Sequence, residues 1–126
     1  MRRLAIRLAL GAALLGMTTS AATAHHSGAM FDAEQTVTLN GTVRQFQWAN
    51  PHCFIQLLVR DAQGREQEWS LEMSAPVHLM RLGWTRSTLT PGERITVTLH
   101  PLRNGDRGGN VVTVTGPDGQ LLEATR

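Results

Sequence analysis

The chain has 126 residues, of which 41% are hydrophobic and 17% charged, and its formal net charge is +2. This length suits one domain and is too short for two independent cores. Five Pro and twelve Gly are near average usage and no heptad or collagen period is present, which excludes a coiled coil, a fibre and a wholly disordered chain.

Residues 1–24 have the three-part layout of a secretory signal peptide. Arginines at the start lead into an apolar run from Leu8 to Met17, and Ala22-Thr23-Ala24 forms a small-x-small cleavage site. The run is too short for a membrane span, which needs about 20 residues. We expect cleavage after Ala24, export to the periplasm by the general secretory route, and a mature chain that begins at His25.

Removal of the signal peptide leaves nine Arg against ten acidic residues, a formal charge of −1. These arginines are scattered among acids and form no basic stripe, which argues against a nucleic-acid partner. No second hydrophobic segment follows. The mature chain is therefore expected to be a monomer without a membrane span, and its partner to be a periplasmic protein or a small ligand.

The first part of the mature chain predicts an arm followed by strands. Residues 25–35 are mostly small and polar, which is typical of an N-terminal arm. A strand pattern starts at Thr36, and Asn40-Gly41 predicts a bulge or a sharp bend within it. Residues 48–52 interrupt the pattern because Pro51 cannot donate to a strand ladder. A second strand follows from about Cys53 to Arg60.

Residues 65–73 alternate polar and apolar side chains, which is typical of a strand with one solvent-exposed face. Glu68 and Glu72 fall on the polar face together with Glu66 and Ser70. We interpret these glutamates as a solvated face.

Residues 74–83 predict one short helix. Ser74 is expected as its N-cap, Pro76 in its first turn and Gly83 at its C-terminal end. The spacing predicts that Val77, Met80 and Leu79 face inward.

The remaining residues predict further strands at 94–100 and 111–115, a Gly-rich loop between them, and a short closing segment at 121–122. The fold class is all-β with one short helix, arranged over residues 36–123 as a small OB-like β-barrel, partly open and with five to six strands. The alternative is a small open β-sandwich, which would have no helix before the fourth strand.

The histidines are the candidate metal ligands. After cleavage, His25 offers its α-amino group and its ring nitrogen, and a second imidazole would complete a T-shaped set of three nitrogens suited to Cu(II). His52 is the first candidate for that imidazole and His100 the second. Alternatively, His26 binds through the amino group, a deprotonated amide and its own ring. A terminus that binds metal only adventitiously is the competing interpretation.

Cys53 is the single cysteine, so an internal disulfide is excluded, and we interpret it as a small buried hydrophobic residue. It would favour Cu(I) only if its sulfur atom lay close to that of Met30 or Met73, so that both could bind one ion.

Four further residues mark a possible ligand surface: Trp48, Asn50, Trp84 and Arg86. Packing in the core and at the barrel mouth is the competing interpretation of the tryptophans, because a small domain needs large side chains to bury area. No catalytic motif is present, since GxSxG, HExxH, a P-loop and a dinucleotide fingerprint are all missing. The chain is therefore not expected to be an enzyme.

Several motifs together resemble a family of small exported bacterial proteins that is known only as a domain of unknown function, DUF6152. They are His25-His26-Ser27, Phe31-Asp32, Gly41-Thr42-Val43, Trp48-Ala49-Asn50-Pro51-His52, Trp69-Ser70-Leu71-Glu72-Met73, Gly83-Trp84-Thr85-Arg86, Pro91-Gly92-Glu93 and Pro117-Asp118-Gly119. The resemblance implies a periplasmic β-rich domain and no particular activity. The expected function is a non-enzymatic binding or accessory protein whose ligand is unknown. Two alternatives are a copper-binding protein that uses His25, His26 and His52, and a glycan- or protein-interaction module.

Overall fold

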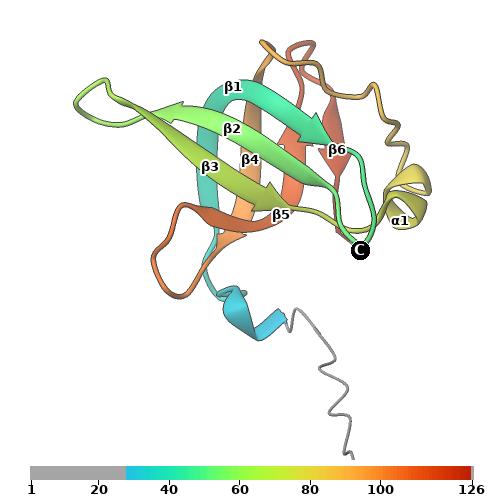
Figure 1. Cartoon of the computed structure of the whole chain (residues 1–126), viewed down its shortest axis with the longest axis horizontal. Helices are drawn as coiled ribbons and strands as arrows, with labels where there is room; N and C mark the ends of the chain where they lie inside the picture. The colour runs from blue at the N-terminus through green and yellow to red at the C-terminus, as the bar shows by residue number, and fades with distance from the viewer. Residues whose placement is uncertain (1–27, 126) are drawn as a thin grey trace, which may run out of the picture.

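The computed structural model describes residues 28–125, and its elements follow the predicted order (Figure 1). They are a 3-10 turn η1 (Gly28–Met30), β1 (Val37–Gln47), β2 (Phe54–Arg60), β3 (Glu66–Glu72), α1 (Pro76–Met80), β4 (Arg94–Pro101), β5 (Gly108–Thr115) and β6 (Leu121–Glu123). Apart from the short helix and the 3-10 turn, the regular structure is all β.

The strands close into a barrel. β1 pairs antiparallel with β2 and with β4, β2 with β3, and β4 with β5. A parallel pairing of β3 with β5 joins the two ends of this series, and β6 adds to β5 outside the ring. Five strands thus form a closed barrel with one extra strand, which confirms the OB-like prediction and decides against the open sandwich.

Two glycines make the closure possible. A Cβ on Gly109 would lie 2.4 Å from Leu99 Cδ1 and 2.5 Å from the His100 carbonyl oxygen. On Gly108 it would lie 2.7 Å from Leu102 Cδ1. β5 can therefore approach β3 and β4 this closely only where it lacks side chains.

The first strand continues through the position where a bulge or bend was expected. β1 pairs with β4 through its first half and with β2 through its second half, and the register shifts between Val43 and Gln45. The bulge is therefore beyond Gly41. Gly41 is needed for close approach, because a Cβ there would lie 2.6 Å from the Leu58 carbonyl oxygen.

The helix is shorter than predicted and begins later. Ser74 is not its N-cap, because the Ser74 carbonyl still accepts the Cys53 amide at 3.1 Å and so continues the β2–β3 ladder. The cap is Ala75, without a side-chain hydrogen bond. Gly83 does end the segment, in the left-handed region with φ of 92°.

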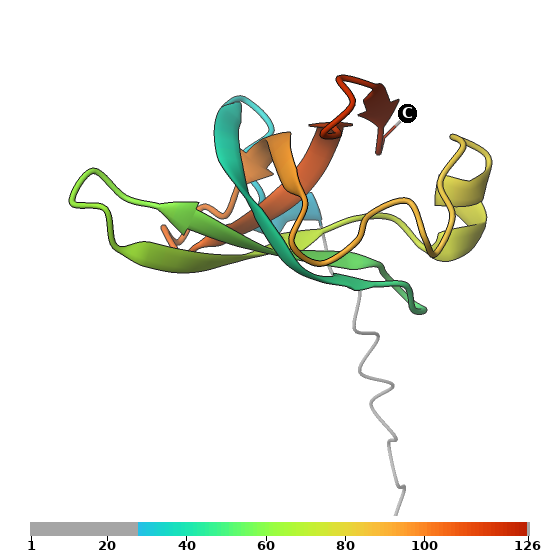
Figure 2. The same cartoon turned by 90° about the horizontal axis from the view of Figure 1, so that it is seen from above.

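The inward face predicted for the helix is correct for Leu79 and wrong for Val77 and Met80. Val77 is 48% exposed and Met80 is 56% exposed, and Leu79 is the residue that is buried. A helix of five residues presents little more than one side chain to the barrel. Figures 1 and 2 place α1 and the tip of the β2–β3 hairpin at opposite ends of the molecule.

The core consists of the inward-facing side chains of the barrel together with buried residues of α1 and of the segment that follows it, such as Leu79 and Trp84. Its largest fully buried members are Trp84, Ile55, Leu57, Leu71, Met73, Leu79 and Leu99. Within residues 28–125, no helix is long and apolar enough to cross a membrane.

Candidate functional site

The candidate site lies on the outer face of β2 and β3. Direct cross-strand partners share a face of a sheet, and Phe54 faces Glu72 while Gln56 faces Ser70. The Gln56 side-chain amide donates to Gln47 Oε1 at 3.1 Å and to Ser70 Oγ at 3.2 Å. This face, flanked by the loop 48–53 and the loop 102–107, is where OB-like barrels hold their ligands.

A histidine and a glutamate meet at one end of this face. His52 Nδ1 lies 2.6 Å from Glu72 Oε1, and the two side chains are 32% and 11% exposed. A proton must lie between a ring nitrogen and a carboxylate oxygen at this distance, so Nδ1 donates to Glu72. In a neutral ring with its proton on Nδ1, Nε2 bears the lone pair.

Backbone hydrogen bonds fix the residues next to His52 and next to Glu72. The Cys53 amide donates to the Ser74 carbonyl, and the Met73 amide donates to the Cys53 carbonyl at 2.9 Å. The ladder of β2 and β3 thus continues past the end of each strand. Cys53 thus lies opposite Met73, one step beyond the pair of Phe54 and Glu72, and His52 reaches Glu72 diagonally across the two strands.

Glu72 corrects the interpretation of a solvated face, because it is only 8% exposed. Glu66, Glu68 and Ser70 are exposed as expected. Glu72 differs because it lies at the end of β3 against His52, and it lines a pocket together with Phe31 and Leu102. The pairing with His52 was not predicted. The register of the hairpin could have predicted it, because equal numbers of residues on both sides of the turn put Phe54 opposite Glu72. His52 lies two residues before Phe54, which makes it a diagonal neighbour of Glu72.

The arm is attached to the barrel beside this pair. The Asp32 amide donates to the Pro101 carbonyl at 2.8 Å, and the Arg103 amide donates to the Met30 carbonyl at 2.9 Å. Met30 and Phe31 line a mainly apolar pocket of about 260 Å³ whose wall also includes Glu72. The first described residues of the arm therefore share a pocket with the partner of His52.

The predicted ligand surface is only partly at the surface. Asn50 and Arg86 are exposed and Trp48 is half-buried. Trp84 is 1% exposed, and its indole N–H donates to the Glu123 carbonyl at 2.8 Å. Trp84 therefore belongs to the core, and Phe46 lies between the two indoles, with ring centroids 5.8 Å from Trp48 and 5.9 Å from Trp84.

The proposed metal ligands are divided between described and undescribed residues. His25 and His26 lie outside residues 28–125. His100 Nδ1 is 2.7 Å from the Gln35 carbonyl oxygen. Within the described residues, no place gathers three or more His, Cys, Asp or Glu side chains able to hold a metal ion. A metal site that includes His52 therefore needs donors from outside this part of the chain.

Cys53 is buried, as predicted. Burial raises the pKa of its thiol, against the weaker opposing effects of a backbone hydrogen bond with Ala49 and of the Arg86 charge. Met73 is buried as well, so neither sulfur atom is available at the surface to bind Cu(I).

We expect Cys53 in the native protein to react with a thiol reagent at least about a hundredfold more slowly than in denaturant, because only the exposed thiolate is nucleophilic. The thiol favours the folded state at pH values below the ordinary thiol pKa. That contribution is lost as the pH rises through the raised pKa of the folded state. Labelling with and without urea measures the rate ratio. Equal rates would contradict the burial of Cys53.

Comparison with known proteins gives a family and a distant structural likeness. A family model described as "Family of unknown function (DUF6152)" matches residues 13–111. No curated protein matches. A solved structure of the mitochondrial single-stranded DNA-binding protein Rim1 from S. cerevisiae is similar over 72% of this chain and 97% of that chain, with 9% sequence identity and a TM-score of 0.47.

Proposed function

The chain belongs to the DUF6152 family of unknown function, and we propose that it is a non-enzymatic periplasmic protein that binds Cu(II) between its processed N-terminus and His52. The amino group and ring of His25 supply two nitrogens, and His52 Nε2 supplies the third. Glu72 orients the His52 ring. The single observation that supports the proposal most is the 2.6 Å contact of Glu72 with His52 Nδ1.

The contact matters because metal-binding histidines usually donate their second ring N–H to a carboxylate or a carbonyl. Such a partner selects the tautomer, fixes the ring orientation and makes the ligating nitrogen more basic. Glu72 does this for His52 while lying almost wholly buried. A buried carboxylate has lost much of its hydration, so its bond to the ring is a strong restraint on the ring.

The length of the arm supports the second part of the proposal. His25 precedes Gly28 by three residues, and three residues span at most about 11 Å. Gly28–Met30 forms the first described turn, and Met30 shares a pocket with Glu72. The α-amino group left by cleavage after Ala24 is thus tethered by a short segment to the part of the barrel that holds the His52–Glu72 pair.

The donor chemistry favours copper. An amine and two imidazoles are nitrogen donors, for which Cu(II) exceeds the other divalent first-row metals in affinity. A square-planar Cu(II) ion accepts three such donors in a T shape and leaves one position for another ligand.

The test is a Cu(II) titration of the processed protein, with its N-terminus verified by intact mass and binding followed by calorimetry and electron paramagnetic resonance. We expect one tightly bound Cu(II) per chain. Loss of a ligand in His52→Gln should weaken binding by about a hundredfold and loss of the orienting charge in Glu72→Gln by roughly tenfold. One extra residue before His25 should abolish the site, because it removes the chelate of amine and ring.

His100→Gln is the matched comparison, because it removes an imidazole that a carbonyl holds by Nδ1, and it should leave copper affinity unchanged. An affinity that ignores His52→Gln but falls with His26→Ala would show a chelate of the terminus alone and contradict the proposal. Sensitivity to His100→Gln in place of His52→Gln would also contradict it.

A second candidate function is recognition of a glycan or a protein on the β2–β3 face. The side-chain ladder of Gln47, Gln56 and Ser70 favours it, because amide and hydroxyl groups suit sugar hydroxyls and backbone amides. Such a ligand would bind without copper and would be lost in Gln56→Ala, which leaves the copper ligands intact.

A further inference from the structure

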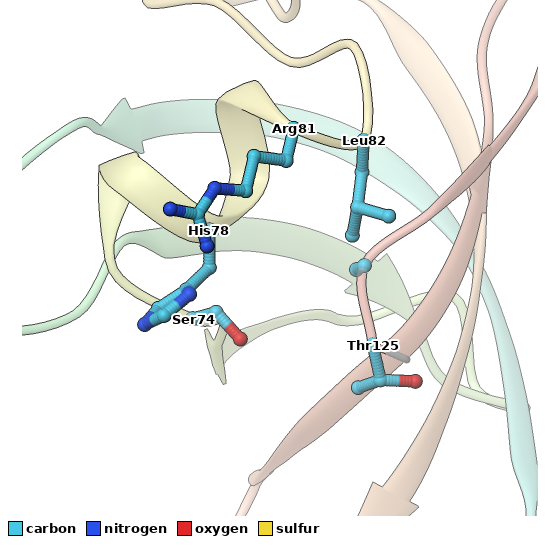
Figure 3. Close-up of a pocket in the computed structure, with 6 residues that line it drawn as sticks. Ser74, His78, Arg81, Leu82 and Thr125 are labelled. Atoms are coloured by element: carbon cyan, nitrogen blue, oxygen red, sulfur yellow. The ribbon is translucent and has the colours of Figure 1, made fainter.

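A pocket on another part of the surface lies between α1 and the segment that follows β6. It has a volume of about 230 Å³ and is lined by Ser74, His78, Arg81, Leu82, Ala124 and Thr125. It shares no lining residue with the pocket that contains Met30 and Glu72. In Figure 3 the Arg81 side chain folds back over His78, and Leu82 and Thr125 face them across the opening.

The polar side of this pocket is cationic. Arg81 is always charged, His78 adds a second nitrogen donor beside it, and the lining contains no acidic side chain. None of the ion pairs found among residues 28–125 includes Arg81. An anion in the pocket would therefore give the Arg81 guanidinium a charge-assisted partner that the lining itself does not supply.

The opposite side of the pocket is apolar. Leu82 is half-buried and keeps some exposed apolar surface, so a ligand that fills the pocket removes water from this wall. A phosphate dianion is costly to desolvate against such a wall, whereas an alkyl chain gains from it. The hydroxyl groups of Ser74 and Thr125 add hydrogen-bonding groups at the rim.

We propose that this pocket binds a small organic carboxylate with a short alkyl chain. The planar guanidinium of Arg81 matches the two oxygens of a carboxylate, and His78 lies beside it as a second donor. The alkyl chain lies against Leu82. The volume of about 230 Å³ is below the range of roughly 300–1,000 Å³ typical of drug-sized ligands, so the ligand is smaller than these.

The test is a titration of the processed, ¹⁵N-labelled protein with sodium butyrate, followed by amide chemical shifts. We expect saturable shifts confined to residues 74–82 and 124–125. Arg81→Gln should weaken binding at least about tenfold, because a charge-assisted hydrogen bond is lost. Arg60→Gln is the matched control, since Arg60 is exposed at the other end of the barrel, and it should leave the affinity unchanged.

Two further probes test the chemistry of the ligand. n-Butanol has the alkyl chain without the charge, and inorganic phosphate has the charge without the chain, so both should bind at least about tenfold more weakly than butyrate. Butyrate shifts that do not saturate, or that persist unchanged in Arg81→Gln, would overturn the proposal. Phosphate binding as tight as butyrate binding would overturn the assignment to a carboxylate.

Discussion

Trp84→Ala should lower the free energy of unfolding by about 4 kcal/mol, because removal of a buried Trp creates a large cavity. Trp84 is 1% exposed and packs against Phe46. For a domain of this size, such a loss lowers Tm by roughly 15–30 °C. Urea unfolding followed by circular dichroism measures the effect. A change in the free energy of unfolding below about 1 kcal/mol would contradict the role of Trp84 as a core residue.

Trp84→Phe separates packing from hydrogen bonding. It keeps an aromatic ring in the core but removes the indole N–H that donates to the Glu123 carbonyl, for an expected loss of about 1–2 kcal/mol beyond the reduction in packing. This hydrogen bond joins the segment after α1 to β6. Because Ala124 and Thr125 follow directly, Trp84→Phe should also weaken butyrate binding, although Trp84 does not line the pocket.

Gly109→Ala should be the second large effect, with a loss of about 3 kcal/mol in the free energy of unfolding and a fall in Tm of roughly 10–20 °C. The new Cβ would lie 2.5 Å from the His100 carbonyl oxygen, a backbone atom that cannot move without breaking the ladder. Leu99 Cδ1, at 2.4 Å, is the end of a flexible side chain and gives way more easily.

The same change tests how the barrel closes. Gly109 pairs with Leu71 of β3 on one side and with Pro101 of β4 on the other, so the strain acts at the only parallel pairing found among residues 28–125. Gly28→Ala is the matched control, because nothing lies within 4 Å of the added Cβ, and it should stay within about 0.5 kcal/mol of the parent. Equal melting curves for the two variants would show that the close approach is not required.

The strands could be predicted from the chain because their evidence is local. Alternation of polar and apolar residues identified β3 and β4, and an apolar run identified β2 together with the burial of Cys53. Gly83 marked the end of the helical segment for a reason that is also local, since only a glycine adopts a φ of 92° without strain.

The inward face of the helix could not be predicted in the same way. Periodicity states which residues share a face, but the barrel decides which face is covered, and a helix of five residues offers it only Leu79. Ser74 shows the same limit: it is a good capping residue, yet its carbonyl is already engaged by the Cys53 amide. Tertiary hydrogen bonding therefore overrode the local preference.

The candidate site was predicted in part. His52 was selected because a turn presents it, but Glu72 was assigned to a solvated face because its neighbours on β3 are polar. The alternation is correct, but it does not show that Glu72 contacts His52 and lines a pocket with Phe31 and Leu102, all of which are far from Glu72 in the sequence. For Trp84 the sequence left core packing and a ligand surface open, and the contacts with Phe46 and the Glu123 carbonyl decide for the core.

The sequence by itself determined the fold class, the order of the elements, the family resemblance and the histidine of the proposed site, because these depend on residue types and spacings along the chain. Only the tertiary structure decided which side chains meet. The parallel pairing of β3 with β5 closes the barrel, the hairpin register joins His52 to Glu72, and β6 brings Thr125 opposite Arg81. These contacts link residues 20 to 44 positions apart, and they form only because burial of one shared core outweighs the chain entropy that each closure costs.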